Sequence, residues 1–386
     1  MKLFILLLCL LLTGCASTEP IPTVPAQTTL PPAAETTSPL STEPTAPTQA
    51  SVQEEKIRRI LSQLTIEERV GQLFLARCDE TVAIDHASAY HLGGYVLFDR
   101  DFEQETPQSM ADKLAGYQAA ATLPLLIAVD EEGGTVTRVS SHRAFRDTAF
   151  PSPRKAYERG GWENLRAVEE EKCALLQSLG INVNLGPVCD IATDKSAFLY
   201  PRSFGQDPVR TSQFVSQTVE LMRQYGIGSV LKHFPGYGNN ADTHTGIVSD
   251  SRSLESLEGY DLVPFQAGID AGCGAIMVSH TIVEALDDTL PASLSPAVHR
   301  YLREEMGFTG VILTDDLVMQ AITEQYGAGE AAVLAILAGN DLLCSTEYMQ
   351  QYEAVLEAVT LGRIDFDTLN NAVRNVLEWK LELGLL

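Results

Sequence analysis

Basic side chains are scarce in this chain of 386 residues, which has 27 Lys and Arg against 51 Asp and Glu and a formal net charge of −24. Nucleic-acid binding needs Lys and Arg clustered on one face, so this composition argues against nucleic acid as a partner. The negative charge speaks to solubility and does not identify a substrate. The hydrophobic fraction of 45% is enough for a large folded domain.

A long hydrophobic run is lacking at the N-terminus, where residues 3–12 are apolar but too few for a membrane-spanning helix. This run has the length of a signal peptide and leads into Leu12-Thr13-Gly14-Cys15, which resembles a bacterial lipobox. An ordinary signal peptide and an uncleaved anchor are the alternatives. We expect residues 1–15 to be a lipoprotein signal peptide and Cys15 to be lipidated. The protein would then be extracytoplasmic and lipid-anchored to the bacterial cell membrane.

Residues 16–52 contain no Lys or Arg and are rich in Thr, Pro, Ala and Ser. Such a composition cannot bury a core and is typical of an extended, disordered tether. We expect this segment to hold a single folded domain, residues 53–386, away from the membrane surface.

Cysteine is infrequent, and its spacing matches no metal-binding motif. The expected domain has five cysteines, an odd number: Cys78, Cys173, Cys189, Cys273 and Cys344. Four of them lie in or beside apolar runs. We expect buried, free thiols, with one disulfide as the alternative in an exported protein. No His-x-x-x-His pair occurs, which disfavours a metal site built on His233, Asp242 and His244. Neither a metal nor a cofactor is expected.

From residue 70 onward the chain repeats one pattern: an apolar strand, a polar or glycine-rich turn and a helix-length stretch. Alternating strands and helices imply parallel pairing, because parallel strands need a crossover. Eight such units predict a (β/α)8 TIM barrel, with a doubly wound open sheet as the alternative. We prefer the barrel because polar residues recur at so many strand ends. The predicted strands are 70–76, 94–98, 124–129, 181–187, 228–232, 275–279, 310–314 and 341–345.

Helical patterns lie around these strands. Thr65 and Glu68 fit a capping box, in which each side chain binds the backbone N–H of the other residue. The predicted helices include 54–61, 162–180, 211–225, 295–306 and an amphipathic C-terminal helix at 367–383.

Residues 232–246 form the most informative stretch. A Lys232-His233 pair stands where the fifth predicted strand ends, and a proline and glycines then break regular structure. Asp242 and His244 follow in the same loop. A carboxylate that orients an imidazole is a recurrent device for proton transfer near neutral pH.

Polar groups follow other predicted strands too, Asp190 and His280 among them. None is specific alone, because an Asp at a strand end is more often a helix N-cap, which is the role we expect for Asp316. Together they are informative, because barrel active sites collect at the carboxyl ends of the strands and these groups would converge there. Asp315 follows a tight apolar run that would hold its carboxylate rigidly beneath the anomeric carbon of a sugar. The donors and the carboxylate that suit a hydroxyl-rich ligand are Lys232, His233, Arg138, Arg202 and Asp130.

Several motifs resemble those of family 3 glycoside hydrolases, specifically their β-N-acetylhexosaminidases, over about residues 54–386. One stretch is similar to the family's Asp-x-Glu-Gly-Gly-x-Val-x-Arg, namely Asp130-Glu131-Glu132-Gly133-Gly134-Thr135-Val136-Thr137-Arg138. Another is similar to Arg-Ser-Phe-Gly-x-Asp-Pro, namely Arg202-Ser203-Phe204-Gly205-Gln206-Asp207-Pro208. Lys232-His233-Phe234-Pro235-Gly236 resembles the best-known signature, and residues 291–295 and 313–317 also match.

The resemblance implies a retaining mechanism through a covalent glycosyl-enzyme, with Asp315 as the nucleophile. It makes His244 the general acid and then the base, with Asp242 as its partner. The added C-terminal domain from which many relatives take this group is not expected here. Tyr237 is a departure, because the family often has His at that position. The residues implied to bind the terminal N-acetylglucosamine are Asp130, Arg138, Arg202, Lys232 and His233.

The expected protein is therefore a monomeric, exo-acting β-N-acetylhexosaminidase. Its carbohydrate substrates would be peptidoglycan-derived or chitin-like fragments with a terminal non-reducing N-acetylglucosamine. A phosphorylase is one alternative, since a neutral imidazole repels an incoming anion less than a carboxylate does. A lipoprotein that binds sugars or muropeptides without catalysis is another. We also expect the loop beyond its glycines to be mobile, with His244 away from Asp315 until a ligand binds.

Overall fold

The computed structural model describes residues 49–205 and 207–386. The predicted signal peptide with Cys15, the predicted tether up to residue 48, and Gln206 lie outside these residues. Helix α1 (Gln49–Gln63) opens the described part. Helical structure thus begins four residues before the expected start of the folded domain at residue 53.

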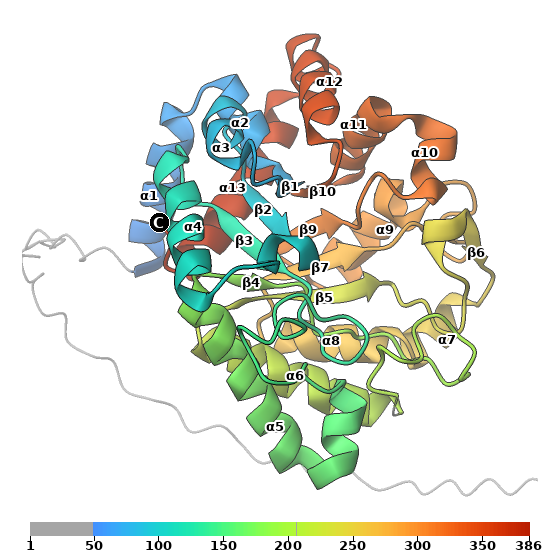
Figure 1. Ribbon diagram of the computed structural model, residues 1–386. Helices are drawn as coiled ribbons and strands as arrows, with labels where there is room; N and C mark the ends of the chain where they lie inside the picture. The colour runs from blue at the N-terminus through green and yellow to red at the C-terminus, as the bar shows by residue number, and fades with distance from the viewer. Residues whose placement is uncertain (1–48, 206) are drawn as a thin grey trace, which may run out of the picture. The chain divides into compact units, whose positions relative to one another are not determined.

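Eight parallel strands form one sheet in the order β10-β1-β2-β3-β4-β5-β7-β9 (Figure 1). The two ends of this order meet as well, because Leu313 bridges Leu342 in parallel and the Thr314 N–H donates to the Leu342 carbonyl over 3.2 Å. The sheet closes on itself, so the predicted (β/α)8 barrel is confirmed and the open-sheet alternative is wrong. The strands are β1 (Phe74–Arg77), β2 (Gly94–Leu97), β3 (Leu126–Val129), β4 (Val183–Asn184), β5 (Gly228–Phe234), β7 (Ala275–Val278), β9 (Val311–Thr314) and β10 (Leu343–Ser345).

The first strand lies later in the chain than its apolar run predicted. A strand is predicted at residues 70–76, but Ile66–Gln72 forms helix α2 and β1 begins only at Phe74. The predicted capping box is present: the Glu68 N–H donates to Thr65 Oγ1 over 3.2 Å, and the Thr65 N–H donates to Glu68 Oε2 over 2.7 Å. This cap starts a helix that runs on through the first apolar residues.

A small second sheet was not predicted. Its parallel strands β6 (Val248–Asp250) and β8 (Thr281–Val283) come from the loops that follow β5 and β7. Each has three residues, which is too short for a clear alternating pattern. The pair lies on the side of the barrel where the strands end, beside the loop at 232–246.

Helices surround the barrel (Figure 1). Two predicted helices differ from the structure: α5 starts earlier and bends at Gly160 and Gly161, and the helix expected at 295–306 divides into α9 and a π-helical turn, Tyr301–Glu305. Besides α1, the α-helices of the described residues are α2 (Ile66–Gln72), α3 (Ala83–Ala89), α4 (Pro107–Ala120), α5 (Pro153–Leu179), α6 (Pro208–Gln224), α7 (Leu254–Gly259), α8 (Leu262–Asp270), α9 (Pro296–Arg300), α10 (Gln320–Tyr326), α11 (Ala328–Ala338), α12 (Tyr348–Thr360) and α13 (Phe366–Glu382).

The barrel interior is packed with apolar side chains from alternate strand positions, such as Leu126 and Ala128 of β3. At the amino-terminal end of the strands, Trp379 of α13 closes this core. A Cβ on Gly274 would lie 2.0 Å from Trp379 Nε1, so glycine is required there. The closed, rigid interior leaves the opposite rim to carry the polar groups.

The five cysteines of the folded part are buried and unpaired. Burial raises the pKa of the Cys78 thiol to about 12, which keeps this group protonated at neutral pH. The prediction of buried thiols is confirmed.

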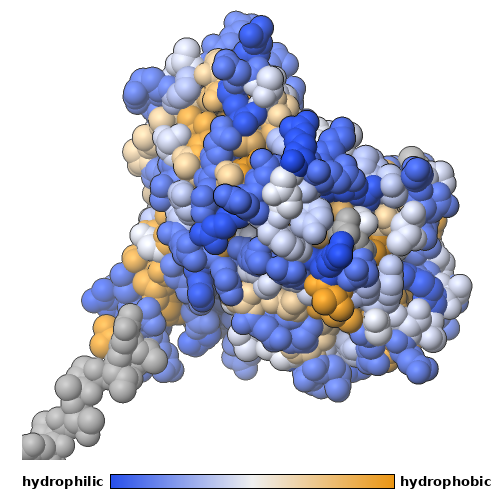
Figure 2. All heavy atoms as spheres, turned by 90° about the horizontal axis from the view of Figure 1, so that it is seen from below, coloured by the Kyte–Doolittle hydropathy of each residue, from blue (hydrophilic) through white to orange (hydrophobic). Residues whose placement is uncertain are grey.

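Figure 2 shows a face on which hydrophilic residues dominate and apolar residues form separate groups. The large apolar side chains that are exposed come from different elements; Val209 of α6 and Leu361 after α12 are the most exposed of the described ones. In the part of the chain that is described, no helix is both long and apolar enough to cross a membrane.

Candidate active site

The carboxyl ends of the strands enclose a cavity of about 610 Å³. Seven of the eight predicted catalytic and binding residues line it, and Asp242 stands directly behind one of them, His244. The strand-end groups therefore converge on one face, as their positions in the sequence suggested. The seven lining residues are Asp130, Arg138, Arg202, Lys232, His233, His244 and Asp315.

Lys232 at the end of β5 is held between two carboxylates. Its Nζ lies 2.5 Å from Asp130 Oδ1 and 2.6 Å from Glu132 Oε1, and the side chain is almost fully buried. Burial lowers the pKa of Lys232, but the two carboxylates raise it more, and the net shift is upward. Burial likewise raises the pKa of Glu132, while Lys232 and Arg202 lower it to well below its usual range. Both groups stay charged, and the third ammonium proton is left to donate to a ligand.

Arg202 forms a bidentate ion pair with Glu132. Its Nε and Nη2 donate to Glu132 Oε2 and Oε1 over 3.0 and 2.8 Å, a bidentate geometry that fixes the guanidinium plane. Glu132 was not among the predicted site residues, although it occupies the Glu position of the Asp-x-Glu-Gly-Gly motif. Its neighbour Glu131 turns the other way and accepts hydrogen bonds from the backbone N–H groups of Arg138 and Val139.

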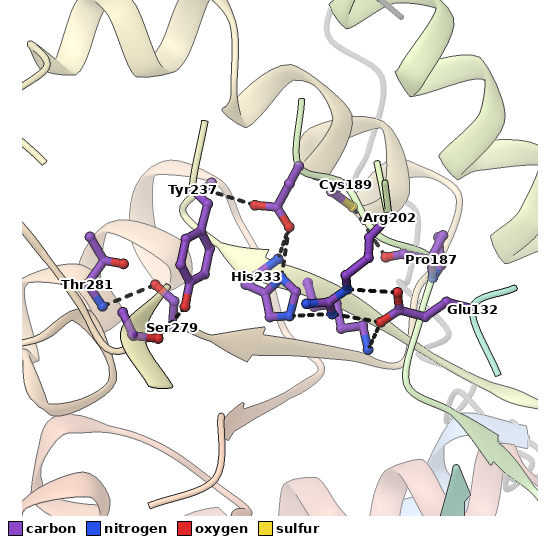
Figure 3. A network of polar contacts seen from close by, with 12 residues as sticks. Glu132, Pro187, Cys189, Arg202, His233, Tyr237, Ser279 and Thr281 are labelled. Atoms are coloured by element: carbon purple, nitrogen blue, oxygen red, sulfur yellow. Dashed lines mark hydrogen bonds and ion pairs between the residues drawn. The ribbon is translucent and has the colours of Figure 1, made fainter. Parts of the chain in front are cut away.

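His233 is oriented by Asp190, a strand-end residue to which the sequence gave no clear role. Asp190 Oδ2 accepts from the His233 backbone N–H over 2.9 Å and lies 2.8 Å from Nδ1. Asp190 thus fixes the orientation of the ring, and Nε2 on its other side lies 3.2 Å from Arg202 Nη2. Figure 3 shows the resulting line of contacts from Tyr237 through His233 and Arg202 to Glu132.

Asp315 directly follows β9 and is buried. Its Oδ1 accepts the Asp316 N–H over 2.9 Å. Burial raises the pKa of this carboxyl, but the electrostatic effects of His233 and His280, together with that hydrogen bond, outweigh burial and lower the pKa below its usual value. Asp315 is therefore an ionised carboxylate at the floor of a cavity, the state that a nucleophile needs.

Asp316 does not cap a helix, contrary to our expectation. Its carboxylate accepts hydrogen bonds from the Val318 N–H over 3.1 Å and from Thr346 Oγ1 over 2.6 Å. Helix α10 begins only at Gln320. Asp316 thus ties the turn after β9 to the turn after β10.

His280 is a buried, neutral support beneath Asp315. Its Nε2 donates to the Asp316 carbonyl over 3.0 Å, and Ser293 Oγ donates to Nδ1 over 2.7 Å. Burial is the largest influence on the His280 ring and lowers its pKa. Since both ring nitrogens are engaged, His280 positions the turn that carries Asp315.

His244 and Asp242 form the pair expected from their spacing. Asp242 Oδ1 accepts the His244 backbone N–H over 2.9 Å and lies 2.6 Å from Nδ1. The His244 side chain is 57% exposed, and its ring meets the edge of Phe198 with 6.1 Å between centroids. His244 lines the same cavity as Asp315, and the closure of this loop on a ligand stays a prediction.

Tyr237 joins the fixed and the exposed parts of this loop. Its backbone N–H donates to Asp190 Oδ1 over 2.8 Å, and its hydroxyl bonds to Thr243 Oγ1. Both hydroxyls are buried, and Thr243 lies between Asp242 and His244 in the sequence. Arg252 adds a second tie, from Nη2 to the Gly236 carbonyl over 3.0 Å. The peptide bonds Lys232–His233 and Phe234–Pro235 are cis.

We expect Tyr237→Phe to lower kcat/KM about tenfold for substrates with a poor leaving group, and less for an activated aryl substrate. The substitution removes one hydrogen bond and leaves the Thr243 hydroxyl unpaired, which costs on the order of 1 kcal/mol. The control is Tyr301→Phe, because Tyr301 bonds to Glu258 on the surface. Equal losses for both substrates would mean that Tyr237 does not act through His244.

A second cavity of about 610 Å³ opens at the amino-terminal end of the strands. It is lined by the glycine-rich turns before β5, β7 and β9 and by α13, including Glu378 and Trp379. None of the predicted site residues lines it. The two cavities have the same volume, so size does not identify the active site. The convergent polar groups identify the cavity at the carboxyl ends of the strands as the candidate. Within residues 49–205 and 207–386, no three His, Cys, Asp or Glu side chains are grouped to hold a metal ion.

This arrangement of strand-end residues has counterparts among known proteins. Residues 65–379 match the family described as "Glycosyl hydrolase family 3 N terminal domain". The chain belongs to glycosyl hydrolase family 3. The resemblance drawn from the motifs is confirmed at this level, and the family 3 chain is a glycoside hydrolase.

Similar proteins include bacterial enzymes named beta-hexosaminidase. One from Xanthomonas campestris pv. campestris (strain B100) is 33% identical over 299 residues, which are 75% of this chain and 87% of that protein. Beta-hexosaminidase LpqI from Mycobacterium tuberculosis (strain ATCC 25618 / H37Rv) is 30% identical over 302 residues, or 75% and 76% of the two chains. A solved glycoside hydrolase family 3 beta-N-acetylglucosaminidase from Paenibacillus sp. str. FPU-7 has a TM-score of 0.77 and 32% identity, over 83% of this chain and 63% of that one. This chain thus spans less than two thirds of the Paenibacillus protein.

Proposed function

We propose that this family 3 chain is an exo-acting, retaining β-N-acetylhexosaminidase. It would remove terminal non-reducing N-acetylglucosamine from peptidoglycan-derived or chitin-like fragments. The observation that carries the proposal is that the ionised Asp315 carboxylate and the Asp242–His244 pair border one cavity. The names of the similar proteins support the same activity.

The mechanism uses two displacements at the anomeric carbon. In the first, a carboxylate oxygen of Asp315 attacks that carbon, the bond to the leaving-group oxygen breaks, and protonated His244 donates its proton to that oxygen. In the second, neutral His244 takes a proton from water as the water oxygen attacks, and the ester bond to Asp315 breaks. Each displacement inverts the carbon, so the product keeps the β configuration.

Asp242 fixes the tautomer of His244 by accepting a hydrogen bond from Nδ1. Because Asp242 Oδ1 accepts from Nδ1, the proton that is transferred belongs to Nε2. The carboxylate also stabilises the imidazolium, as the aspartate of a catalytic triad does. Lys232, Arg202 and His233 would bind the terminal sugar together with Asp130 and Arg138, because their charges and donors are already fixed by Glu132 and Asp190.

Hydrolysis, phosphorolysis and binding without reaction predict different products. We expect digested peptidoglycan to release free N-acetylglucosamine at the same rate with and without added phosphate, measured by mass spectrometry. A sugar phosphate formed only with phosphate would make the chain a phosphorylase instead. Saturable binding in calorimetry with no product over hours would make it a sugar-binding lipoprotein.

We further propose that the protein is monomeric, extracytoplasmic and anchored by lipid at Cys15 to the bacterial cell membrane. The lipobox-like Leu12-Thr13-Gly14-Cys15 and the Thr/Pro-rich segment after it support this proposal. Cys15→Ser should move the protein from the membrane fraction to the soluble fraction of expressing cells, while activity per molecule stays the same. Unchanged membrane association of this variant would contradict lipidation at Cys15.

A further inference from the structure

The loop that carries His244 leaves the barrel at Gly236 and returns at Arg252, and these two residues are in contact. Arg252 Nη2 donates a hydrogen bond to the Gly236 carbonyl over 3.0 Å, across 16 positions of the chain. The loop is therefore closed at its base, with Asp242 and His244 between the joined ends. Sequence analysis gave no role to Arg252, because it stands outside the motifs quoted above.

Arg252 is itself fixed by two buried carboxylates. Its Nε and Nη2 donate to the Asp250 carboxylate at the end of β6, over distances of 2.6 to 3.0 Å. Its Nη1 donates to Asp261 Oδ2 over 2.6 Å. Asp250 and Asp261 are 3% and 1% exposed. We call Asp250, Arg252 and Asp261 the loop clamp. Because each guanidinium nitrogen has an acceptor, the plane of Arg252 is fixed before any ligand binds.

The backbone of the loop lies directly on this clamp at two glycines. Gly236 and Gly238 have φ of 113° and 56°, a region that favours glycine. A Cβ on Gly236 would lie 2.7 Å from Asp261 Cβ, and one on Gly238 would lie 2.8 Å from Arg252 Nη1. The glycines thus allow the base of the loop to approach the clamp closely enough for the hydrogen bond to Gly236.

One peptide group joins the clamp to the residues proposed to bind the sugar. Its carbonyl, that of Gly236, accepts from Arg252. Its N–H, that of Tyr237, donates to Asp190 Oδ1 over 2.8 Å. Asp190 also orients the ring of His233. Since both polar atoms of this peptide are bonded, the loop cannot swing as a rigid unit from its base without breaking these hydrogen bonds. Movement is left to the residues between Tyr237 and β6, which include the catalytic pair.

We propose that Arg252 is a positioning residue for proton transfer, which holds both ends of the loop so that His244 reaches the same place beside Asp315 in both displacements. This inference rests on the proposed glycosidase function and names a residue on which its acid/base steps depend. Among the described residues that line the cavity, Arg252 is not one, so it acts through the backbone of the loop. A misplacement of about 1 Å can cost about a hundredfold in rate.

The first test compares Arg252→Gln with wild type on N,N′-diacetylchitobiose and on p-nitrophenyl N-acetyl-β-glucosaminide. For the disaccharide, kcat should fall about ten- to a hundredfold while KM changes less than about twofold, because the groups that bind the sugar stay in place. With the aryl substrate, the glycosyl-enzyme should form in a burst and then turn over slowly, since attack by water needs the base. Azide should restore turnover of the variant, release the β-glycosyl azide and leave the wild-type rate nearly unchanged.

The matched control is Arg303→Gln. Arg303 also donates to two backbone carbonyls, those of Phe308 and Gly310, and to a buried carboxylate. These contacts lie at the amino-terminal end of the barrel, beside the second cavity. Any loss in this variant should be equal for both substrates, and azide should change neither rate.

Arg252→Lys keeps a positive charge between the two buried carboxylates and so protects the fold. A lysine cannot bond to all three acceptors in the geometry of a guanidinium. This variant should therefore show the pattern of Arg252→Gln with a smaller loss. Equal losses for both substrates in these two variants, without rescue by azide, would overturn the proposal.

A second measurement needs no variant. In the native enzyme, amide hydrogen exchange should be slow at Tyr237 and at residues 248–250, and faster at residues 239–246. Exchange at one common rate over residues 236–252 would overturn the proposal. If wild type cleaves neither substrate, the proposed function fails, whereas cleavage of both with an unaltered Arg252→Gln variant would refute only the role of Arg252.

Discussion

Replacing Asp315 by Ala or Gly is expected to lower kcat/KM for p-nitrophenyl N-acetyl-β-glucosaminide at least about 10⁴-fold, as loss of a nucleophile does in other enzymes. The carboxylate is the ionised group at the floor of the cavity, and its pKa lies below the usual range. The variant loses the atom that attacks the anomeric carbon, and no neighbouring carboxylate can replace it, because Asp316 is bound by Thr346 and Val318.

Rescue by azide distinguishes the loss of a nucleophile from other causes of inactivity. In Asp315→Gly, azide can enter the space left by the carboxylate and attack the anomeric carbon directly. One displacement inverts that carbon, so the product should be the α-glycosyl azide, identified by NMR. Turnover near the wild-type rate in purified Asp315→Ala would refute the nucleophile assignment. A folded but inactive variant that azide does not rescue would point to a supporting role for Asp315.

The lowered pKa of Asp315 also fixes the sign of a pH effect. Its active form is the ionised one, and that form persists as pH falls through the usual range of a carboxyl group. Loss of kcat/KM on the acid side of a pH profile, above that range, must then come from another group.

The barrel was predictable because its signals are local. Each strand is a short apolar run, and glycine or polar residues mark where it ends, so the eightfold repeat can be counted from the sequence. Lys232 and Asp315 stand at such ends, and parallel strands place their carboxyl ends on one face. Convergence of these residues therefore follows from topology alone.

Local signals fail where two short patterns compete. The run at 70–76 is apolar enough for a strand, yet the cap at Thr65 starts a helix through Gln72. β4 has only two residues where seven were expected. The length of β4 depends on its pairing with β3 and β5, which are distant from it in sequence.

The pairing of charges was also beyond sequence reasoning. Glu131 and Glu132 are adjacent and chemically identical, but one binds backbone N–H groups and the other binds Lys232 and Arg202. The turn at Gly133 and Gly134, with φ of 95° and 72°, follows the pair and helps to direct Glu132 toward Lys232 and Arg202. The contact of Arg77 with Phe98 was likewise not predictable, because the two residues lie at the ends of different strands.

Replacing His244 by Ala is expected to lower kcat/KM about 10³-fold for a disaccharide and far less for an aryl substrate. General acid catalysis contributes about 10²- to 10⁴-fold, and only a poor leaving group needs the proton. Asp242→Asn should show the same pattern with a smaller loss, because it weakens the orientation of the ring seen between Oδ1 and Nδ1. Equal losses for both kinds of leaving group would show that His244 supports the loop and transfers no proton.

Rescue of a His244 variant by azide should give the opposite anomeric configuration to rescue of an Asp315 variant. With an aryl substrate, His244→Ala still forms the glycosyl-enzyme, but no base activates water, so the intermediate should accumulate after a burst of the aryl product. Azide needs no base and should release the intermediate as the β-glycosyl azide, because two inversions have then occurred at the same carbon. An α product from Asp315→Gly and a β product from His244→Ala would assign nucleophile and acid/base independently of any loss of rate. A β product from both variants would mean that the carboxylate attacking the anomeric carbon is not Asp315.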